Sequence, residues 1–483
     1  MRPAHRARRA HPRHRPSRPP SLPRTPPYRP RTEPSRRGAR PPPPPPRMPG
    51  QGGASPTTEG LPMPHTPDSS ASRRRVVITG AGVVTAIGTT VEELWTSLVA
   101  GRSGIGPITA FDASDLPTRI AAEVVDFDPL CYMSRRESRR MDHFGRYAVA
   151  AAVQAMEQSG LKTTDENGRR LGVFIGSGYG ANIAGIAAVE RMLERGPKSI
   201  NANYAIGGAP DNPASEVAMR FGAEGPTGAI ITACATGTTC VGEAVHMIRA
   251  GRADAVIAGG ADDPITRLDV AAMANLRALS RRNDEPQRAS RPFDRARDGF
   301  VFGAGAGIVV VEEAEHALRR GAPILAEVVG YGATTDAYHS TAPHPEGLGA
   351  RRALASALQD AGLRPSDVDY VNAHGTSTVL NDRTEVETIR SVFGEHATRI
   401  PISSIKSMIG HLIAGAGTVE LIATLQAMAH GVVPPTLNCD DPEDTELNFV
   451  PNTPQEHTVR TAVSNSFGFG GHNAVLAVRR WEG

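Results

Sequence analysis

The chain has 483 residues, with 53 Lys and Arg against 50 Asp and Glu, which gives a formal net charge of +3. This near balance hides an asymmetry, because residues 1–47 contain fourteen Arg, no Lys and a single acidic residue, Glu33. That segment carries +13, which leaves −10 on the rest of the chain. An acidic main body argues against nucleic-acid binding by the folded part of the protein.

Further features of the composition exclude other classes of protein. The four Cys residues form no CxxC pair, which argues against a disulfide framework and against a thiolate zinc site. No run of about 18 apolar residues is present, which argues against a membrane span. The N-terminus also lacks the apolar core of a secretory signal. We therefore expect a cytoplasmic protein that holds no metal and does not contact the membrane.

Residues 1–72 are predicted to be a disordered tail rich in Arg and Pro. The six consecutive prolines at 41–46 and the repeated Arg-Pro steps favour an extended polyproline conformation and cannot form a core. Three interpretations remain open: a basic arm that contacts nucleic acid or another acidic surface, an extension without function, and an upstream start that is not used. The third arises because Met48 and Met63 precede the first predicted strand.

The first predicted strand covers residues 76–79 and runs into a turn at Gly80 and Gly82. Its glycines resemble half of a dinucleotide-binding fingerprint, but GAGVVTAIG lacks the G-x-G-x-x-G order. The sequence therefore argues against NAD binding at this turn.

Beyond this strand, apolar runs typical of buried strands alternate with stretches of helical periodicity. The strand-like runs are LGVFIG, AIITA, DAVIAGG, AGIVVVEE, ILAEVVGYG and VDYVNA. The clearest helical stretches are YAVAAAVQAMEQSGL and VGEAVHMIRAG. This alternation predicts an α/β fold, with a parallel or mixed sheet covered by helices.

Two of the helical stretches resemble each other. Residues 148–161 and 350–363 both place Ala and Leu at helical spacing, both end in Gly-Leu, and both precede a strand and a Gly-containing turn. Their offset is close to half of the folded part, which predicts two similar α/β halves, residues 73–320 and 321–483. A ligand site is expected where the halves meet. The alternative is that two unrelated Ala-rich helices share this pattern.

Cys234 is the leading candidate for a nucleophile. The strand-like run at 228–233 ends at this residue, and a helical pattern follows it. Free N–H groups and the positive end of the helix dipole favour a thiolate there. The alternative is a small buried Cys that fills a gap in the core, which is also how we interpret Cys240.

His374, His411 and Lys406 are candidate partners of the thiolate. Both histidines follow predicted strands, where sites of α/β proteins collect. Lys406 is one of only three lysines in a chain rich in arginine, which suggests a requirement for a compact ammonium group.

Three carboxylates and one loop complete the candidate set. Asp382 and Glu385 lie on the helix predicted after His374, and Glu420 lies on the helix predicted after His411; each could orient a histidine or Lys406, or be a surface residue. The Gly-rich loop around Phe469 lets backbone N–H groups approach a substrate and could supply an oxyanion donor.

Together these residues resemble the β-ketoacyl-acyl-carrier-protein synthases, in particular the FabF-like enzymes (synthase II type) and the related type II polyketide ketosynthases. The resemblance covers about residues 75–481 and rests on four ordered motifs: TACATGT at Cys234, NAHGTST at His374, KSMIGH at Lys406–His411 and NSFGFGGHN around Phe469. It implies a thiolase-like fold, with two pseudo-repeated α/β halves in five layers (αβαβα).

The resemblance also implies roles for individual residues. Cys234 would accept the acyl chain as a thioester, while His374 and His411 would assist decarboxylation of malonyl-ACP and stabilise the enolate. The backbone N–H groups of Cys234 and Phe469 would form the oxyanion hole, and the Phe469 ring would gate the acyl pocket. Supporting roles would fall to an ion pair of Lys406 and Glu420 near His411, and to Asp382 after His374.

The implied reaction is the condensation of an acyl-ACP with malonyl-ACP to 3-oxoacyl-ACP, CO2 and free ACP in fatty acid elongation. It needs no metal and no bound cofactor, because the phosphopantetheine arm arrives with the acyl carrier protein. The expected assembly is a homodimer or a heterodimer with a related subunit. The alternatives are a chain-extending ketosynthase of a type II polyketide or polyene pathway, and a non-catalytic chain-length partner subunit, against which the retained Cys234 argues.

Some positions depart from the family pattern or allow two interpretations. Ile409 and His472 each stand where the family has Thr, so a third histidine is expected near the site and chain length stays open. The basic run at 134–140 is either a docking patch for the acidic carrier protein or a solvated helix face.

Overall fold

Ten strands of the computed structural model, which describes residues 73–483, are hydrogen-bonded in the order β10-β9-β13-β14-β8-β1-β7-β6-β4-β5. Only two residue pairs, Val77 with Glu327 and Ile78 with Ala326, join β1 to β8, so the strands divide into two groups of five. The first group is β1 (Val76–Val84), β4 (Leu171–Gly176), β5 (Thr227–Gly228), β6 (Ala255–Asp262) and β7 (Gly305–Glu313). The second group is β8 (Ala326–Thr335), β9 (Tyr370–Asn372), β10 (Ile402–Ser403), β13 (Thr461–Gly468) and β14 (His472–Arg479).

The two groups have the same topology. In the first, β1 pairs with β7 and β7 with β6 in antiparallel fashion, whereas β6–β4 and β4–β5 are parallel. In the second, β8–β14 and β14–β13 are antiparallel, whereas β13–β9 and β9–β10 are parallel. Identical order and direction in both groups indicate a duplicated α/β unit.

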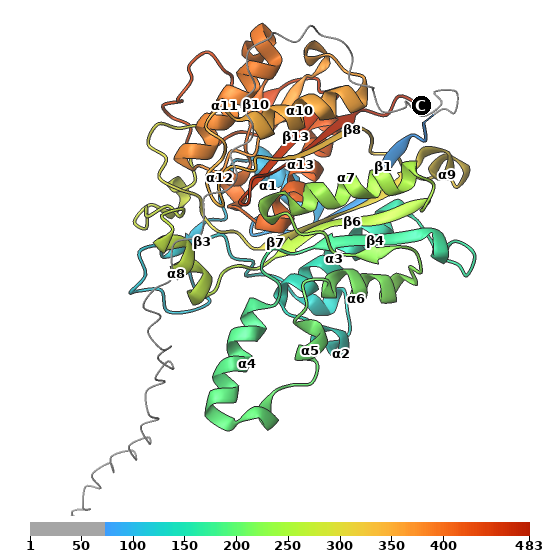
Figure 1. Ribbon diagram of the computed structural model, residues 1–483, viewed down its shortest axis with the longest axis vertical. Coiled ribbons are helices and arrows are strands. Elements are labelled where there is room, and N and C mark those ends of the chain that lie inside the picture. The colour runs from blue at the N-terminus through green and yellow to red at the C-terminus, as the bar shows by residue number, and fades with distance from the viewer. Residues whose placement is uncertain (1–72) are drawn as a thin grey trace, which may run out of the picture. The chain divides into compact units, whose positions relative to one another are not determined.

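Helices separate and cover the two groups of strands, as Figure 1 shows. Helices α3 and α6 pack on the outer side of the first group, α10 with α11 beside it covers the second, and α7 and α13 lie between the groups. This arrangement confirms the predicted five-layer αβαβα architecture. The longer helices are α1 (Val91–Val99), α3 (His143–Ser159), α4 (Asn182–Arg195), α6 (Asn212–Phe221), α7 (Thr236–Arg249), α8 (Arg267–Asn275), α10 (Leu348–Ala361), α11 (Val379–Phe393) and α13 (Ala416–His430).

Short elements complete the described part of the chain. Strand β2 (Gly106–Pro107) pairs with β3 (Ile120–Ala121), and β11 (Val432–Val433) pairs with β12 (Gln455–Glu456). The short helices are α2 (Arg135–Ser138), α5 (Tyr204–Gly207), α9 (Ala314–Arg319) and α12 (Lys406–Ile409). Among these residues, no helix is long and apolar enough to span a bilayer. The tail predicted at 1–72 lies outside the described residues.

The two similar helical stretches occupy equivalent places. Helix α3 packs on β1 and β7, and α10 packs on the corresponding strands β8 and β14. Each helix ends at a glycine, Gly160 or Gly362, in the left-handed conformation that stops a helix at no steric cost. The structure therefore confirms the duplication. The predicted boundary at 320 and 321 falls between α9 and β8, and the division into two domains there stays a prediction.

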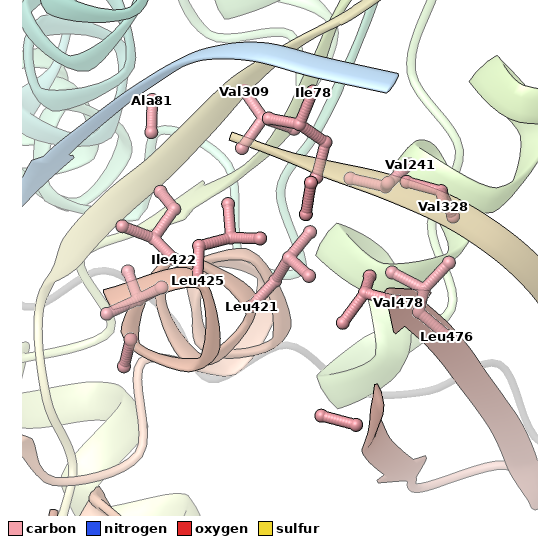
Figure 2. Close-up of a cluster of buried hydrophobic side chains, with 14 of the residues drawn as sticks. Ile78, Ala81, Val241, Val309, Val328, Leu421, Ile422, Leu425, Leu476 and Val478 are labelled. Carbon is pink, nitrogen blue, oxygen red and sulfur yellow. The ribbon is translucent and has the colours of Figure 1, made fainter. Parts of the chain in front are cut away.

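The largest apolar cluster joins the two halves, and Figure 2 shows it at the contact between α13 and the strands. Leu421, Ile422 and Leu425 of α13 pack against Ile78 of β1 and Val309 of β7. All five side chains are buried, and each such burial stabilises the fold by about 1.5–3 kcal/mol. The core therefore holds the central helices in place between the sheets.

The first turns of α7 and α13 approach each other closely, because each has a glycine at its second residue. A Cβ on Gly237 would lie 2.5 Å from Thr418 Oγ1, and one on Gly417 would lie 2.1 Å from Thr238 Oγ1. Both distances are too short for any side chain, so glycine is required on both sides. The close approach brings the residues that precede the two helices to one place.

Candidate active site

Cys234 lies in a tight turn, Ala233–Ala235, directly before α7. The expected strand before it is shorter than predicted, because β5 ends at Gly228 and the following residues pair with no strand. The turn begins at Ala233, whose φ of 49° lies in the left-handed region that L-residues rarely adopt. The Cys234 side chain is 7% exposed and lines a cavity of about 450 Å³.

The Cys234 thiol is protonated at neutral pH in this structure, which corrects the expectation of a resting thiolate. Burial raises the pKa of the thiol to about 11. The backbone N–H groups of Phe469 and of Cys234 donate toward the sulfur and, with the charge of Lys406, pull the pKa down by less. Desolvation of the anion therefore outweighs these two donors and the charge of Lys406.

His374 and His411 line the same cavity as Cys234. Their rings meet edge to face with centroids 5.4 Å apart. The Nδ1 atom of His411 accepts the backbone N–H of Ile413 at 3.3 Å, and Nδ1 of His374 faces the Lys406 ammonium at 3.3 Å. With Nδ1 an acceptor in both rings, the proton of each neutral imidazole lies on Nε2. Among the described residues, Nε2 of His411 has no partner.

Both imidazoles are neutral at physiological pH. Burial, followed by the nearby charge of Lys406, lowers the pKa of His374 and of His411 well below 6.5. Neutral rings with Nε2–H groups donate hydrogen bonds but do not carry charge. The pair is therefore suited to stabilising an oxyanion beside their buried rings.

Lys406 anchors His374. Its buried ammonium donates to the His374 carbonyl at 2.6 Å and forms an ion pair with Glu420. Burial raises the pKa of Glu420 to about 7, and the charge of Lys406 opposes that rise. The expected ion pair is present, but its hydrogen bonds reach His374 rather than His411, on which Lys406 acts only through its charge.

The structure does not bring Asp382 onto His374. The Asp382 carboxylate instead accepts the backbone N–H groups of Phe293 at 2.9 Å and Ser377 at 3.1 Å. Glu385, one helical turn later, accepts the backbone N–H of His374 at 2.8 Å. Glu385 is therefore the carboxylate that holds this histidine. The sequence indicated it through its position on the same predicted helix, one turn beyond Asp382.

The Gly-rich loop is the turn of the β13–β14 hairpin, residues 469–471. Phe469 lines the cavity, and its N–H points at the Cys234 sulfur, so two backbone donors meet there. Gly470 donates its N–H to Ser340 at 2.7 Å, which ties the loop to a neighbouring segment.

The two departures from the family pattern lie outside the cavity. His472 pairs with Thr335 in the sheet and does not itself line the cavity, although its neighbours Gly471 and Asn473 do, so this third histidine lies beside the cavity rather than in it. Ile409 is fully buried in the main apolar cluster beside Met408 and Leu412.

Known proteins share this sequence and arrangement. The sequence profile described as "Beta-ketoacyl synthase, N-terminal domain" matches residues 73–317, and that of the corresponding C-terminal domain matches residues 325–440. The chain is 46% identical to 3-oxoacyl-[acyl-carrier-protein] synthase 2 of Synechocystis over 420 residues, which cover 86% of this chain and 100% of that protein. The protein of the same name from Staphylococcus aureus is 43% identical over 85% of this chain and 100% of its own.

Solved structures give the same result. The ishigamide ketosynthase/chain length factor matches with a TM-score of 0.79 and 38% identity over 85% of this chain and all of that one. A type II polyketide ketosynthase in complex with its acyl-carrier protein, AntDE:AntF, matches with a TM-score of 0.78 and 35% identity over the same shares. With profiles that cover both halves and relatives that align over their full length, this chain belongs to the beta-ketoacyl synthase family.

Proposed function

We propose that the protein is a 3-oxoacyl-[acyl-carrier-protein] synthase of the second type. It joins an acyl chain carried by acyl carrier protein to malonyl-ACP and releases CO2. One observation supports this most directly: Cys234, His374 and His411 line a single cavity. A nucleophile and two uncharged donors that line one cavity match the needs of a condensation through an acyl-enzyme.

In the first half-reaction the Cys234 sulfur attacks the thioester carbonyl of acyl-ACP. The sulfur loses its proton, the carrier's phosphopantetheine thiolate leaves, and that thiolate takes up a proton. Backbone N–H groups of Cys234 and Phe469 meet beside the sulfur and are placed to bind the carbonyl oxygen as it becomes negative. The acyl chain then rests on Cys234 as a thioester.

In the second half-reaction malonyl-ACP loses CO2, and the electron pair of the broken bond moves onto the thioester oxygen. The Nε2–H groups of His374 and His411 stabilise this enolate. Its carbon attacks the acyl-Cys234 carbonyl, and the bond to sulfur breaks as 3-oxoacyl-ACP forms. The electron pair of that bond stays on the Cys234 sulfur, which takes up a proton to restore the thiol. Neutral rings suit this step because each already carries an Nε2–H that can donate a hydrogen bond to the enolate oxygen. Burial keeps the rings neutral.

No group bound by the protein itself takes part in this scheme; the phosphopantetheine arm belongs to the carrier protein. A related ketosynthase is described in complex with its acyl-carrier protein, and another in complex with its chain length factor. We infer that this chain likewise binds acyl carrier protein and works as a homodimer or beside a related subunit. Three exposed arginines near α2, Arg135, Arg136 and Arg139, are available to an acidic carrier, whereas Arg140 pairs with Glu216.

Fatty acid elongation is the main assignment, since relatives named as synthase 2 share 43–46% identity with the chain. A polyketide or polyene pathway is the second candidate, because structural relatives include type II polyketide ketosynthases. A non-catalytic chain-length subunit is disfavoured, because Cys234, His374 and His411 are all present in the cavity.

The test uses the purified full chain with malonyl-ACP and a panel of acyl-ACPs. We expect release of CO2 and formation of 3-oxoacyl-ACP, followed by intact-protein mass spectrometry of the carrier and the enzyme. Turnover of saturated acyl chains supports fatty acid elongation. Turnover restricted to polyene or oxo chains, or dependent on an added related subunit, supports the second candidate. Absence of both acyl loading and CO2 release would refute condensation.

A further inference from the structure

Asp262, the last residue of β6, is a buried carboxylate that the reaction scheme does not use. Its side chain is fully buried, and both oxygens accept hydrogen bonds. Oδ1 accepts from the Ser177 hydroxyl at 2.5 Å and from the Tyr179 N–H at 3.0 Å. Oδ2 accepts the N–H groups of Gly178 at 3.0 Å and Ala414 at 2.9 Å. One carboxylate therefore joins a loop of the first half to a turn of the second.

Both of these segments form walls of the catalytic cavity. The loop carries Tyr179, which lines the cavity and packs edge to face on Phe302 with centroids 6.0 Å apart. The turn is Ile413–Gly415, directly before α13, and its Ile413 side chain lines the same cavity. The segments touch, since a Cβ on Gly178 would lie 3.0 Å from Ile413 Cγ2.

The turn also sets the orientation of His411. The N–H of Ile413 donates to Nδ1 of His411, which leaves the proton of that ring on Nε2. The next N–H along the chain, that of Ala414, donates to Asp262. Two consecutive N–H groups therefore connect the histidine ring and the buried carboxylate through one peptide unit.

This turn has a conformation that needs external support. Ile413 has φ of 49°, in the left-handed region, which is a genuine outlier for a β-branched residue. Such a conformation costs about 1–3 kcal/mol and persists only where surrounding contacts hold it. The hydrogen bond from Ala414 to Asp262 is one such contact, at the residue that follows Ile413.

We propose that Asp262 is a positioning residue for the condensation: it holds the Ile413 turn so that the turn aims His411 Nε2–H into the cavity. The inference rests on the proposed function of His411. A carboxylate suits this place, because three of its partners are N–H groups that can only donate and the Ser177 hydroxyl donates here as well. An amide of the same shape would set its NH2 group against the Tyr179 N–H, or against the N–H groups of Gly178 and Ala414, and leave that donor or pair without a partner.

The principal test is Asp262→Asn, measured in the two half-reactions separately. We expect decarboxylation of malonyl-ACP to fall in kcat by about tenfold or more, the effect of one lost buried hydrogen bond to an aligned donor. The KM for malonyl-ACP should stay within about twofold, and acyl loading of Cys234 should fall less than decarboxylation, because loading does not use His411.

A matched control is Asp294→Asn. Asp294 is also buried and accepts the N–H groups of Ala296, Asp440 and Asp441 at 2.8–2.9 Å, but none of these three residues lines the cavity, whereas Gly178 and Tyr179 beside Asp262 do. This variant should lose thermal stability and keep the wild-type kcat of decarboxylation. Equal losses of kcat in both variants would show that Asp262 is merely structural.

Ile413→Gly tests the strained turn directly. Glycine adopts a positive φ without strain, so it should restore decarboxylation in the Asp262→Asn background by severalfold. If Asp262→Asn does not fold, Ser177→Ala removes one of the four donors and should lower the kcat of decarboxylation by about threefold, with an unchanged KM.

The outcomes separate the two proposals. Wild-type protein that releases no CO2 from malonyl-ACP would refute the proposed function. A wild-type enzyme that decarboxylates, together with a folded Asp262→Asn variant of equal kcat, would overturn the role of Asp262 alone. Failure of Ile413→Gly to restore any rate would also contradict it, because the strained turn would then not be what Asp262 holds.

Discussion

The turn at Ala233–Ala235 and the turn at Ile413–Gly415 are equivalent parts of the duplicated fold. Both begin with a residue at φ 49°, and both lead directly into a central helix, α7 or α13. The last residue of each donates its N–H three residues back at 3.0 Å, Ala235 to Thr232 and Gly415 to Leu412. The two turns therefore share their entry conformation and their closing hydrogen bond.

The middle residues differ, and with them the use of the turn. The first half has Cys234, which lines the cavity; the second has Ala414, whose N–H is bound by Asp262. In the first half, the proposed function leaves the N–H at the helix entrance for a substrate oxygen. In the other it is occupied by a carboxylate that holds a neighbouring histidine. The N–H group at the start of a helix can therefore serve either to bind a substrate or to hold a neighbouring segment in place.

Of the substitutions that test the difference between the two turns, Cys234→Ala should have the largest effect, because it gives the first turn the Ala that the second turn has. Acyl loading should disappear, because no sulfur remains to form the thioester. Intact-protein mass spectrometry after incubation with acyl-ACP measures the loading. Cys240→Ala, six residues along the same helix and also fully buried, should load acyl groups normally. Acyl loading of the Cys234→Ala variant would contradict the assignment of Cys234 as the nucleophile.

The next largest effect is expected for His411→Ala, which removes the imidazole that the second turn holds. Loss of one oxyanion donor lowers kcat by about 10²–10³-fold, so CO2 release from malonyl-ACP should fall by that factor while loading of Cys234 continues. His472→Ala is the control, because His472 does not line the cavity. A His411→Ala rate near that of wild type would show that the second turn has no part in the chemistry.

Lys406→Met breaks the ion pair that the second half contributes. Glu420 would remain buried without its partner, which lowers the free energy of unfolding by about 3–5 kcal/mol. Chemical denaturation measures the change, and the double variant with Glu420→Gln should recover part of the loss. If the double variant is no more stable than the single one, the cost does not come from the uncompensated charge.

Gly237→Ala is the smallest change and probes the contact between the turns. Its Cβ would lie 2.5 Å from Thr418 Oγ1, so the helices must separate, at a cost of about 1–3 kcal/mol. Thermal unfolding measures the loss. Gly106→Ala is the control, since a Cβ there meets nothing within 4 Å. Equal stability of the two variants would show that the close approach of α7 and α13 is not required.

Much of the fold and part of the site could be predicted from local patterns. The alternation of strands and helices, and the similarity of 148–161 to 350–363, predicted a duplicated α/β architecture because periodicity reports burial directly, whereas the five layers were implied by the family resemblance. The motifs around Cys234, His374 and His411 identified residues that now line one cavity. The family pattern also paired Lys406 with Glu420, and the two do form an ion pair.

The remaining features depend on contacts between distant segments. The choice of Glu385 over Asp382 follows from which carboxylate reaches the His374 N–H, and one helical turn separates them. The protonated state of Cys234 follows from burial by both halves, which local sequence does not encode. His472 lies beside the cavity rather than in it because strand pairing sets the face on which a side chain lies.

Residue types, their spacing and their periodicity were enough to predict the α/β class, the internal duplication and the candidate reactive side chains, because each of these follows from chemistry or repetition along the chain; the roles of those side chains came from the family resemblance. Packing decided which donors meet at Cys234, which ring nitrogen of each histidine carries the proton, and that Asp262 reaches Ala414 across the two halves. Those outcomes depend on distances of a few ångströms between segments far apart in the chain, which only the folded protein specifies.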